Sequence, residues 1–258
     1  MEVTQRFTDR ADFYHAHRPR YPKELLTILA NRCEFSPQAI VADIGSGTGI
    51  LSELFLNHGN PVFAVEPNGP MRAIAERHLG NAPQFRSVNG TAEATTLPDA
   101  SVDYVTAAQA FHWFDRARAE VEFARILKPN GWIVLVWNER LVDTSPFARA
   151  YEDLLITSSI DYVAVDPKKV SADAVGLDSF LHKRGGVAAI RHSMIVSLEQ
   201  LAGFLSSASY APLPGHPQYA AMIAKLREIF AEHERDRTVS LDFEMKVYYG
   251  RRFDPSER

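Results

Sequence analysis

The chain has 258 residues, of which 46% are hydrophobic and 23% charged, and this composition excludes a disordered, collagenous or coiled-coil protein. Its 28 lysine and arginine residues stand against 32 aspartate and glutamate residues, a formal net charge of −4 without a long basic run, which argues against a nucleic-acid partner. The single cysteine, Cys33, cannot form a disulfide within the chain and favours a reducing cytoplasm. The lack of a long apolar segment argues against a signal peptide and a membrane span.

The first half of the chain alternates predicted helices and strands. Leu25, Ile28 and Leu29 keep the spacing of one helix face, whereas the continuous apolar run at 39–44 is typical of a buried strand. The same reasoning predicts, in chain order, a helix at 22–29, a strand at 39–44, a helix from 50 that Gly59 ends, a strand at 61–65, a helix from Pro70 to Leu79, strands at 85–88 and 102–108, a helix through Leu127 that the 129–131 turn ends, and a strand at 132–136. This alternation predicts right-handed crossovers and a parallel sheet with helices on both faces.

The alternation loosens after Trp137. We predict a helix at 146–157, a strand at 187–196, helices at 198–205 and 219–233, and a terminal strand at 238–249. Residues 158–186 carry no regular pattern, so the sequence leaves their structure open.

Three glycines, Gly45, Gly47 and Gly49, follow the first predicted strand and precede a helix. Ligands of an open parallel sheet bind beyond the carboxyl ends of its strands, and glycine lets the backbone come close to them. Glu66 ends the second predicted strand, where a carboxylate can accept both hydroxyls of a ribose. A tight turn and a surface carboxylate are the alternatives for each feature alone, but the pair predicts a nucleoside site.

The spacing of the loop bears on which nucleoside is bound. A dinucleotide-binding loop has a glycine where Ile50 stands, so NAD is the second choice of ligand. The Gly-Lys-Ser/Thr sequence of a P-loop is absent, which argues against ATP.

Four ordered blocks of the sequence resemble the motifs of the class I S-adenosylmethionine-dependent methyltransferases. These blocks are Val41–Gly49, Phe63–Pro67, Gly90–Pro98 and Ser101–Val105, all within residues 39–137. Two flanking segments, Tyr14 with Arg18–Pro22 and Ala108–Phe114, are similar to the small-molecule branch of the family that includes trans-aconitate methyltransferase.

The resemblance implies an α/β fold that is Rossmann-like and doubly wound, with a mostly parallel sheet and an antiparallel C-terminal strand. An N-terminal lid and an inserted helical cover would complete it. We therefore expect residues 1–258 to form a single methyltransferase domain. Within it, residues 1–35 would be the lid and first helix, 39–137 the cofactor-binding core, 146–237 the substrate cover with one core strand, and 238–250 the terminal strand.

The resemblance also implies S-adenosylmethionine as the cofactor. The cofactor-binding residues that it predicts are Tyr14, Arg18, Asp43, Gly45, Ser46, Gly47, Gly49, Glu66, Pro67, Met71, Thr91, Ala92, Glu93 and Gln109. Among them Asp43 would hold the methionine part and Glu66 the ribose, while Arg18 would pair with the carboxylate or else be a surface arginine. Many relatives have aspartate where Thr91 stands, so a charged contact to the adenine amine is missing here.

A sulfonium methyl is already electrophilic, so the protein mainly has to align the acceptor and exclude water. His112 and Tyr14 are the candidate catalytic residues: a general base such as His112 would help a hydroxyl acceptor, and a carboxylate acceptor needs none. The alternatives are that His112 orients the acceptor or packs beside Trp113, and that Tyr14 packs on the first helix. His112, Trp113 and Trp137 are the candidate substrate-binding residues, although the tryptophans could equally be core. The histidines show no metal-ligand spacing.

The substrate cover gives little further information on the acceptor. Five cations lie in or near it, namely Lys168, Lys169, Lys183, Arg184 and Arg191. They suit an organic acid, and a solvated surface explains them equally well.

We therefore predict a cytoplasmic S-adenosylmethionine-dependent methyltransferase that acts on a small-molecule substrate, by O-methylation of a carboxylate or hydroxyl. It would use no metal and have no nucleic-acid or membrane partner. One alternative is a non-catalytic S-adenosylmethionine-binding module, which the threonine at position 91 favours. Another is an NAD-dependent oxidoreductase.

Overall fold

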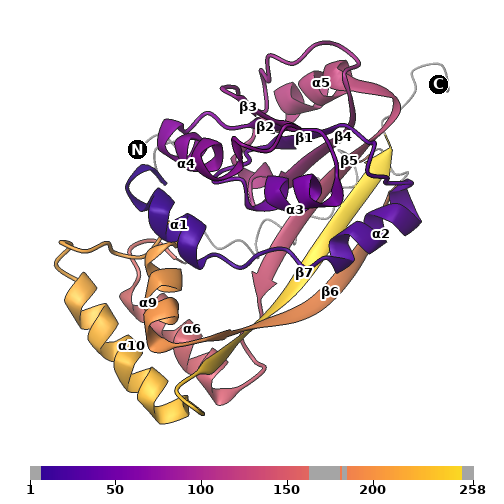
Figure 1. Cartoon of the computed structure of the whole chain (residues 1–258). Coiled ribbons are helices and arrows are strands. Elements are labelled where there is room, and N and C mark those ends of the chain that lie inside the picture. The colour runs from indigo at the N-terminus through magenta and orange to yellow at the C-terminus, as the bar shows by residue number, and fades with distance from the viewer. Residues whose placement is uncertain (1–6, 163–180, 182–184, 252–258) are drawn as a thin grey trace.

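A computed structural model describes residues 7–162, 181 and 185–251 of the chain. Their strands form one seven-stranded sheet with the order β3-β2-β1-β4-β5-β7-β6 (Figure 1). The strands are β1 (Val41–Ile44), β2 (Val62–Val65), β3 (Phe85–Val88), β4 (Val102–Ala108), β5 (Leu127–Arg140), β6 (Gly185–Val196) and β7 (Val239–Arg251). Within this sheet β7 is antiparallel to both neighbours, and the other described pairings are parallel. The predicted fold class is confirmed.

The described residues contain all the predicted helices. The α-helices are α1 (Ala11–His17), α2 (Glu24–Cys33), α3 (Ile50–His58), α4 (Gly69–Leu79), α5 (Arg116–Ile126), α6 (Pro146–Ser158), α9 (Leu198–Ser206) and α10 (Tyr219–His233), and the 3-10 helices are η2 (Thr8–Arg10) and η3 (Phe111–Trp113). Of these, α1, η2 and η3 were not predicted. No helix among the described residues is both long and apolar enough to cross a bilayer.

Neighbouring side chains of the central strands point to opposite faces of the sheet, and each face packs against helices in a core of its own. In β1, Val41 packs with α2 and α3 on one face, whereas Ala42 and Ile44 pack with α5 on the other. A strand that is buried on both faces needs a continuous apolar sequence, and this explains the run from which β1 was predicted. Asp43 shares the face of Val41, because alternate residues of a strand point the same way, and it therefore faces α3.

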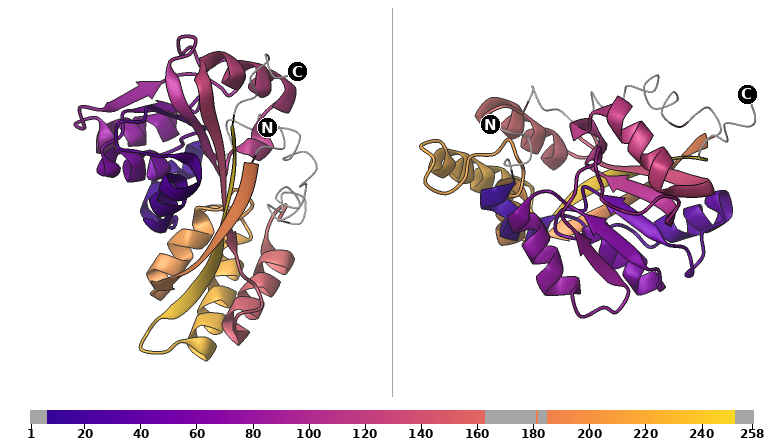
Figure 2. Two further views of the ribbon diagram at one scale, coloured as in Figure 1. Left: turned by 90° about the vertical axis from the view of Figure 1, so that its right-hand side faces the viewer. Right: turned by 90° about the horizontal axis from the view of Figure 1, so that it is seen from above.

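The helices α6, α9 and α10 form a further core with one end of β7 (Figures 1 and 2). Val239, Leu241 and Phe243 of β7 supply its strand side. This is the segment predicted as the substrate cover, and the helices and strands predicted for its described residues are confirmed.

The strand β5 is longer than predicted at both ends. Residues 127–131, predicted as a helix end and a turn, belong to the strand, because Leu127 pairs with Val102 and a register shift before Tyr104 accommodates the extra residues. At the other end β5 continues to Arg140, which pairs with Phe243 of β7. Pairing with β7 thus lets β5 continue as a strand into the region of the cover.

The segment of η2 and α1 joins the two parts of the molecule (Figure 1). Ala11 packs against Met71 and Ile74 of α4, whereas Arg10 donates hydrogen bonds to the carbonyl oxygens of Ala208 and Ala211 beyond α9. These contacts place the segment predicted as a lid against both the core and the cover.

Candidate functional site

The strand order reverses between β1 and β4, and three adjoining cavities lie at the carboxyl ends of these strands. We name each after a residue that lines it: the Asp43 cavity, the Glu66 cavity and the His112 cavity. Tyr14 and Gln109 line all three, so the cavities meet at these two side chains. An open parallel sheet binds its ligands at such a switch point.

The structure brings most of the predicted cofactor-binding residues together around two of these cavities. The Asp43 cavity is lined by Tyr14, Arg18, Asp43, Gly45, Ser46, Gly47 and Gln109, and the Glu66 cavity by Tyr14, Gly45, Gly47, Glu66, Pro67, Met71, Thr91, Ala92, Glu93 and Gln109. Gly49 is the exception among the predicted residues, because it lines neither cavity.

Asp43 is a buried carboxylate at the end of β1. It accepts a hydrogen bond from the Ser52 hydroxyl at 2.7 Å and one from the Thr106 hydroxyl at 3.2 Å. Burial raises the pKa of Asp43 to about 7, an effect that these hydrogen bonds oppose and the nearby Glu66 carboxylate increases. A buried carboxylate with a raised pKa is a group that a bound cation would stabilise.

Glu66, at the end of β2, is held by two backbone amides. Its Oε2 accepts a hydrogen bond from Gly47 and its Oε1 one from Asn68, each at 2.8 Å. Burial raises the pKa of Glu66, and the two amides partly oppose that rise. Gly47 lines both cavities, and its φ of +58° is one that side chains rarely adopt.

The glycine at position 49 is required by packing. A Cβ there would lie 2.6 Å from Leu79 Cδ1 and 3.3 Å from Ala75 Cβ, so the glycine lets α4 approach the start of α3. Its φ of +83° adds a conformational requirement. Packing therefore requires glycine at position 49, whether or not this residue contacts a ligand.

A loop between β3 and β4 closes the far side of the Glu66 cavity with Thr91, Ala92 and Glu93. The Glu93 carboxylate accepts a hydrogen bond from the Asp115 amide at 2.8 Å. Glu93 therefore connects this loop to the segment that precedes α5.

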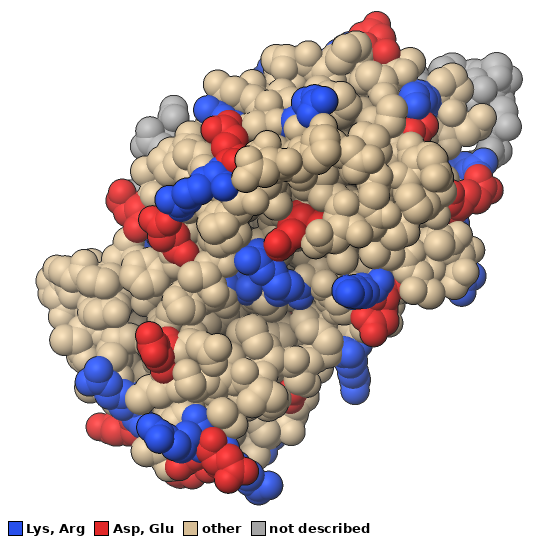
Figure 3. All heavy atoms as spheres, in the orientation of Figure 1, with Lys and Arg blue, Asp and Glu red and all other residues tan. Residues whose placement is uncertain are grey.

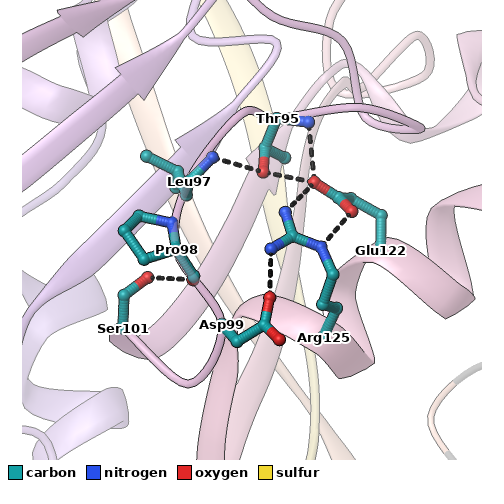
Figure 4. A network of polar contacts seen from close by, with 7 residues as sticks. All are labelled: Thr95, Leu97, Pro98, Asp99, Ser101, Glu122 and Arg125. Carbon is teal, nitrogen blue, oxygen red and sulfur yellow. Dashed lines mark hydrogen bonds and ion pairs between the residues drawn. The ribbon is translucent and has the colours of Figure 1, made fainter.

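A network of polar contacts that sequence reasoning missed anchors the same loop to α5 (Figure 4). Glu122 Oε1 accepts hydrogen bonds from the Thr95 amide at 2.7 Å and the Thr95 hydroxyl at 2.5 Å. Arg125 binds both Glu122 oxygens and also pairs with Asp99 at 2.5 Å. The Arg125 guanidinium beside Glu122 lowers the pKa of that carboxyl to about 2.

His112 lies on η3 and lines the third cavity. Its ring lies 4.5 Å from that of Trp113, which lines the His112 and Glu66 cavities. Burial lowers the pKa of His112 to about 4, and its Nδ1 is buried without a hydrogen-bond partner among the described residues. The imidazole is therefore neutral at physiological pH.

Helix α1 supplies Tyr14, and Arg18 follows that helix. The Arg18 guanidinium lies 5.1 Å from the Tyr14 ring and 5.3 Å from the Phe204 ring, so two aromatic faces hold it. Its Nε is buried and unpartnered in the part of the chain that the structure describes. Burial raises the pKa of Tyr14, so its hydroxyl keeps its proton.

Trp137 does not line the acceptor pocket as the sequence predicted. It is buried in the core, with its ring against those of Phe111 and Tyr248. Alternation along β5 places Trp137 on the α5 side of the sheet, and it is not among the residues that line the three cavities.

The cations predicted for the cover give no support to an organic-acid site. Lys168, Lys169, Lys183 and Arg184 lie outside the described residues. The Arg191 side chain is 77% exposed and pairs with Glu244 of β7 at 3.4 Å.

Sequence reasoning missed half of the wall of the His112 cavity. The missed lining residues are Phe7, Asn138, Glu139, Arg140, Tyr162, Phe204 and Phe243, whereas Ser209 and Tyr210 belong to a serine-rich run that the sequence offers as a source of hydroxyl contacts, with a plain helix terminus as the alternative. The one available signal was the cluster of polar residues directly after the apolar run of β5, at 138–140.

The face drawn in Figure 3 carries lysine and arginine side chains interspersed with aspartate and glutamate. No extended patch of a single sign covers it, as a phosphate-backbone footprint would require. Among the described residues, no group of three or more histidine, cysteine, aspartate or glutamate side chains is placed to hold a metal ion.

The core of the chain is similar to known methyltransferases. Residues 42–135 match a family described as a methyltransferase domain. An uncharacterized methyltransferase of Mycobacterium tuberculosis is 40% identical over 143 residues, which cover 54% of each chain. The chain thus spans about half the length of the curated relatives it matches.

Solved structures extend the likeness to most of the chain. A putative type II methyltransferase from Anaeromyxobacter dehalogenans has a TM-score of 0.67 at 25% identity, covering 92% of this chain and 98% of that one. A SAM-dependent methyltransferase from Geobacter sulfurreducens in complex with S-adenosyl-L-homocysteine has a TM-score of 0.53 at 17% identity, covering 97% and 99%. The second likeness concerns the fold alone.

Proposed function

Residues 42–135 are a methyltransferase domain with the class I fold, and on this premise we propose that the chain transfers a methyl group from S-adenosylmethionine to an oxygen atom of a small-molecule acceptor. The class predicted from the sequence is thereby confirmed, and S-adenosylmethionine is the cofactor of that class. The observation that carries the proposal is the placement of Gly47, which lines both the Asp43 cavity and the Glu66 cavity.

The residues present fit such a cofactor. One ligand that carries an ammonium group at one end and a ribose at the other suits two buried carboxylates whose cavities share a glycine backbone. Ser46 Oγ, in the wall of the Asp43 cavity, is buried without a hydrogen-bond partner among the described residues. Burial of such atoms is unfavourable unless a bound group satisfies them.

Each residue then has a part in holding the cofactor. Asp43 would bind the ammonium group and Arg18 the carboxylate of the methionine end. Glu66 would accept the ribose hydroxyls. The loop held by Glu122 would close over the adenine, with Ala92 supplying its amide. When bound, the cofactor supplies a methyl group on a positively charged sulfur, an electrophile that needs no metal.

The His112 cavity is the proposed acceptor site because it adjoins the other two at Tyr14 and Gln109. An imidazole with a pKa of about 4 is a weak base, since catalytic bases work best with a pKa near the operating pH. A carboxylate is already ionised and needs no base. We therefore assign methylation to a carboxylate oxygen, with His112 orienting the acceptor by a hydrogen bond.

A non-catalytic binding module is the second candidate, because Thr91 offers the adenine no charge. The Thr91 amide and carbonyl bond to the Ala94 backbone, so this residue also has a structural role. We further propose a cytoplasmic location without nucleic-acid partners, in view of the lone cysteine and the mixed surface charge.

Calorimetric titration with S-adenosylhomocysteine and with NAD tests the cofactor. We expect binding of the former alone, and saturable binding of NAD alone would overturn the assignment. A screen for transfer of a labelled methyl group to carboxylic acids and to the corresponding alcohols tests the reaction. Labelled esters are expected. Tight cofactor binding without transfer to any acid or alcohol would favour the non-catalytic module.

A further inference from the structure

Half of the residues that line the His112 cavity carry an aromatic ring, a larger share than in the Asp43 cavity or the Glu66 cavity. Apart from Tyr14, these residues are Phe7, Trp113, Tyr162, Phe204, Tyr210 and Phe243. They come from the N-terminal segment, η3, α9, β7 and the segments that follow α6 and α9. Rings from both the core and the cover thus form one wall, and such a wall suits a ligand that has an aromatic ring itself.

The rings that the cover contributes are arranged edge to face. The Tyr162 and Tyr210 rings lie 4.7 Å apart at an interplanar angle of 67°, and the Phe204 and Phe243 rings lie 6.1 Å apart at 77°. A ring that meets its neighbour edge-on keeps its own faces uncovered by that contact, and a further aromatic ring prefers such faces and edges. An alkyl group of equal size would gain only the burial of its area.

Arg140 lines the same cavity and keeps one donor unused. Its Nη2 pairs with Glu152, which also accepts hydrogen bonds from the Tyr162 hydroxyl at 2.8 and 3.0 Å. The guanidinium carbon lies 4.9 Å from the centre of the Tyr151 ring, so the group is held from two sides. Nη1 is buried without a hydrogen-bond partner among the described residues. Arg140 therefore offers a ligand a fixed and positively charged donor.

Asn138 supplies a second donor on the same face of β5. Alternate residues of a strand share a face, so Asn138 and Arg140 point to the same side, roughly 7 Å apart along the strand. Asn138 Oδ1 lies 2.8 Å from His192 Nε2, whereas Nδ2 is buried and unpartnered in the part of the chain that the structure describes. Glu139 points to the opposite face, where it pairs with Lys246 at 2.8 Å, and takes no part in the site.

The lining of the cavities orders these groups relative to the cofactor site. Asn138 lines the Asp43 cavity as well as the His112 cavity, and its carbonyl oxygen accepts the hydrogen bond of the Gln109 side chain. An anion bound to Asn138 therefore lies close to the junction of the cavities. Tyr162, Phe204 and Tyr210 line the His112 cavity alone, so the rest of the ligand extends toward the cover.

Resting on the proposed function, we propose that the acceptor is a carboxylic acid that carries an aromatic ring. Arg140 Nη1 and Asn138 Nδ2 donate hydrogen bonds to its carboxylate, and the ring packs among the aromatic side chains of the cover. Methylation replaces the anion with a neutral ester. Because a charge-assisted hydrogen bond is stronger than a neutral one, the ester binds more weakly than the acid, and this favours release of the product.

Three matched probes test the proposal: phenylacetate, cyclohexylacetate and 2-phenylacetamide. Their dissociation constants are measured at pH 8 by ligand-observed NMR on the full chain, with and without saturating S-adenosylhomocysteine. We expect phenylacetate to bind at least about tenfold more tightly than the neutral amide, and at least about threefold more tightly than the cyclohexyl acid. The cyclohexyl group buries at least as much apolar area as the phenyl group, so burial alone does not favour phenylacetate.

The outcomes of this experiment are distinct. Equal binding of phenylacetate and either of the other probes overturns the proposal, and so does binding of none. Because S-adenosylhomocysteine binding is measured on the same samples, a failure of the proposed cofactor is seen separately.

Two variants assign the preferences to individual residues. Arg140→Gln is expected to lose the preference for acid over amide, and Tyr210→Leu to reduce the preference for the phenyl over the cyclohexyl acid. Since Arg140→Gln leaves Glu152 without its cation, Arg140→Gln/Glu152→Gln removes both charges and is measured alongside. Arg149→Gln, at an exposed position of α6, and Tyr219→Leu, which lines none of the three cavities, are the controls. Wild-type preferences in both variants would overturn the proposal.

Discussion

The Gln109 side-chain amide donates a hydrogen bond to the Asn138 carbonyl oxygen at 2.8 Å, and this contact joins the ends of β4 and β5 where the three cavities meet. Gln109 adopts a φ of +54°, a left-handed conformation that is unfavourable for any residue with a Cβ. The residue thus combines a conformational cost with a central position, a combination typical of functional sites.

Two substitutions separate these properties of Gln109. Both Gln109→Gly and Gln109→Ala lose the amide, so we expect both to reduce methyl transfer by about tenfold through misplacement of the reacting groups. Only glycine relieves the left-handed backbone, so the glycine variant should be more stable than the alanine variant by about 1 kcal/mol. Activity assays and urea unfolding measure both effects. Equal stability of the two variants would show that the backbone is not strained.

The lowered pKa of His112 predicts how the reaction responds to pH. The pKa lies near 4 in the folded protein, so the imidazole is neutral throughout pH 6–9 and protonates only as the pH falls through about 4. We expect methyl transfer at saturating substrate to show no titration step near pH 6.5. A rise in rate centred near pH 6.5 that disappears in His112→Ala would identify a general base instead.

Replacement of His112 should affect turnover and spare cofactor binding. We expect His112→Ala to slow turnover by about tenfold, less than the roughly 10²- to 10⁴-fold effect of a general acid or base, because His112 orients the acceptor and transfers no proton. Its affinity for S-adenosylhomocysteine should stay near that of the wild type, because His112 lines neither cofactor cavity. His216→Ala, at an exposed position, is the matched control. Unchanged turnover would reduce His112 to a packing residue.

The raised pKa of Asp43 makes the stability of the ligand-free protein depend on pH. Because the folded-state pKa of about 7 exceeds the usual 3.8, the stabilising contribution is complete below about pH 4 and is lost as pH rises through 7. Asp43→Asn removes this dependence, so the change in stability between pH 5 and pH 8 should shrink by roughly 2–3 kcal/mol. Urea unfolding at both pH values measures it, with Asp153→Asn, at an exposed position of α6, as the control. An unchanged dependence would place the Asp43 pKa near its ordinary value.

Local signals explain which parts of this fold the sequence predicts. The apolar run of β1, the glycine loop and the amphipathic α3 are adjacent in the chain, so their pattern alone fixes a strand, a turn and a helix. The same holds for Glu66, which occupies the residue after β2. Most of the residues predicted for the Asp43 and Glu66 cavities could be identified from the sequence because they lie within a few short segments of the chain.

Contacts between distant segments explain what the sequence does not predict. Arg140 reaches the His112 cavity because β5 is extended by pairing with β7, which lies more than 100 residues later in the chain. Glu122 belongs to α5 and could have been a solvent-facing helix residue, but the loop that carries Thr95 folds onto it. The prediction that Trp137 lines the acceptor pocket was wrong, because the face that this residue occupies depends on how the sheet packs against α5.

The network around Glu122 should control cofactor affinity through the adenine loop. Glu122→Gln removes the negative charge that pairs with Arg125 and replaces one of its two carboxylate acceptors with an amide donor, which should cost about 1–2 kcal/mol of stability. Release of the loop should weaken S-adenosylhomocysteine binding about fivefold or more, by the entropy of ordering it again. Asp99→Asn is the control, because the Asp99 side chain is 79% exposed and an exposed ion pair contributes little. Calorimetry that shows equal affinity in both variants would separate this network from the cofactor.

Gly47 and Gly49 provide the last comparison, because both adopt positive φ but have different surroundings. A Cβ at Gly47 would lie 3.2 Å from the mobile end of Met71, within the wall of both cofactor cavities. Gly47→Ala should therefore fold but lose at least about tenfold in S-adenosylhomocysteine affinity, and Gly47→Val should abolish binding.

A Cβ at Gly49 instead overlaps Leu79 Cδ1 at 2.6 Å, so Gly49→Ala should lose about 2 kcal/mol or more of stability from overpacking. Its folded fraction should bind S-adenosylhomocysteine nearly as well as the wild type. The conformational cost of a side chain at positive φ is shared by the two alanine variants, so each serves as the control for the other. Thermal unfolding and calorimetry distinguish them. If Gly49→Ala keeps full stability but loses affinity for S-adenosylhomocysteine, Gly49 belongs to the cofactor site.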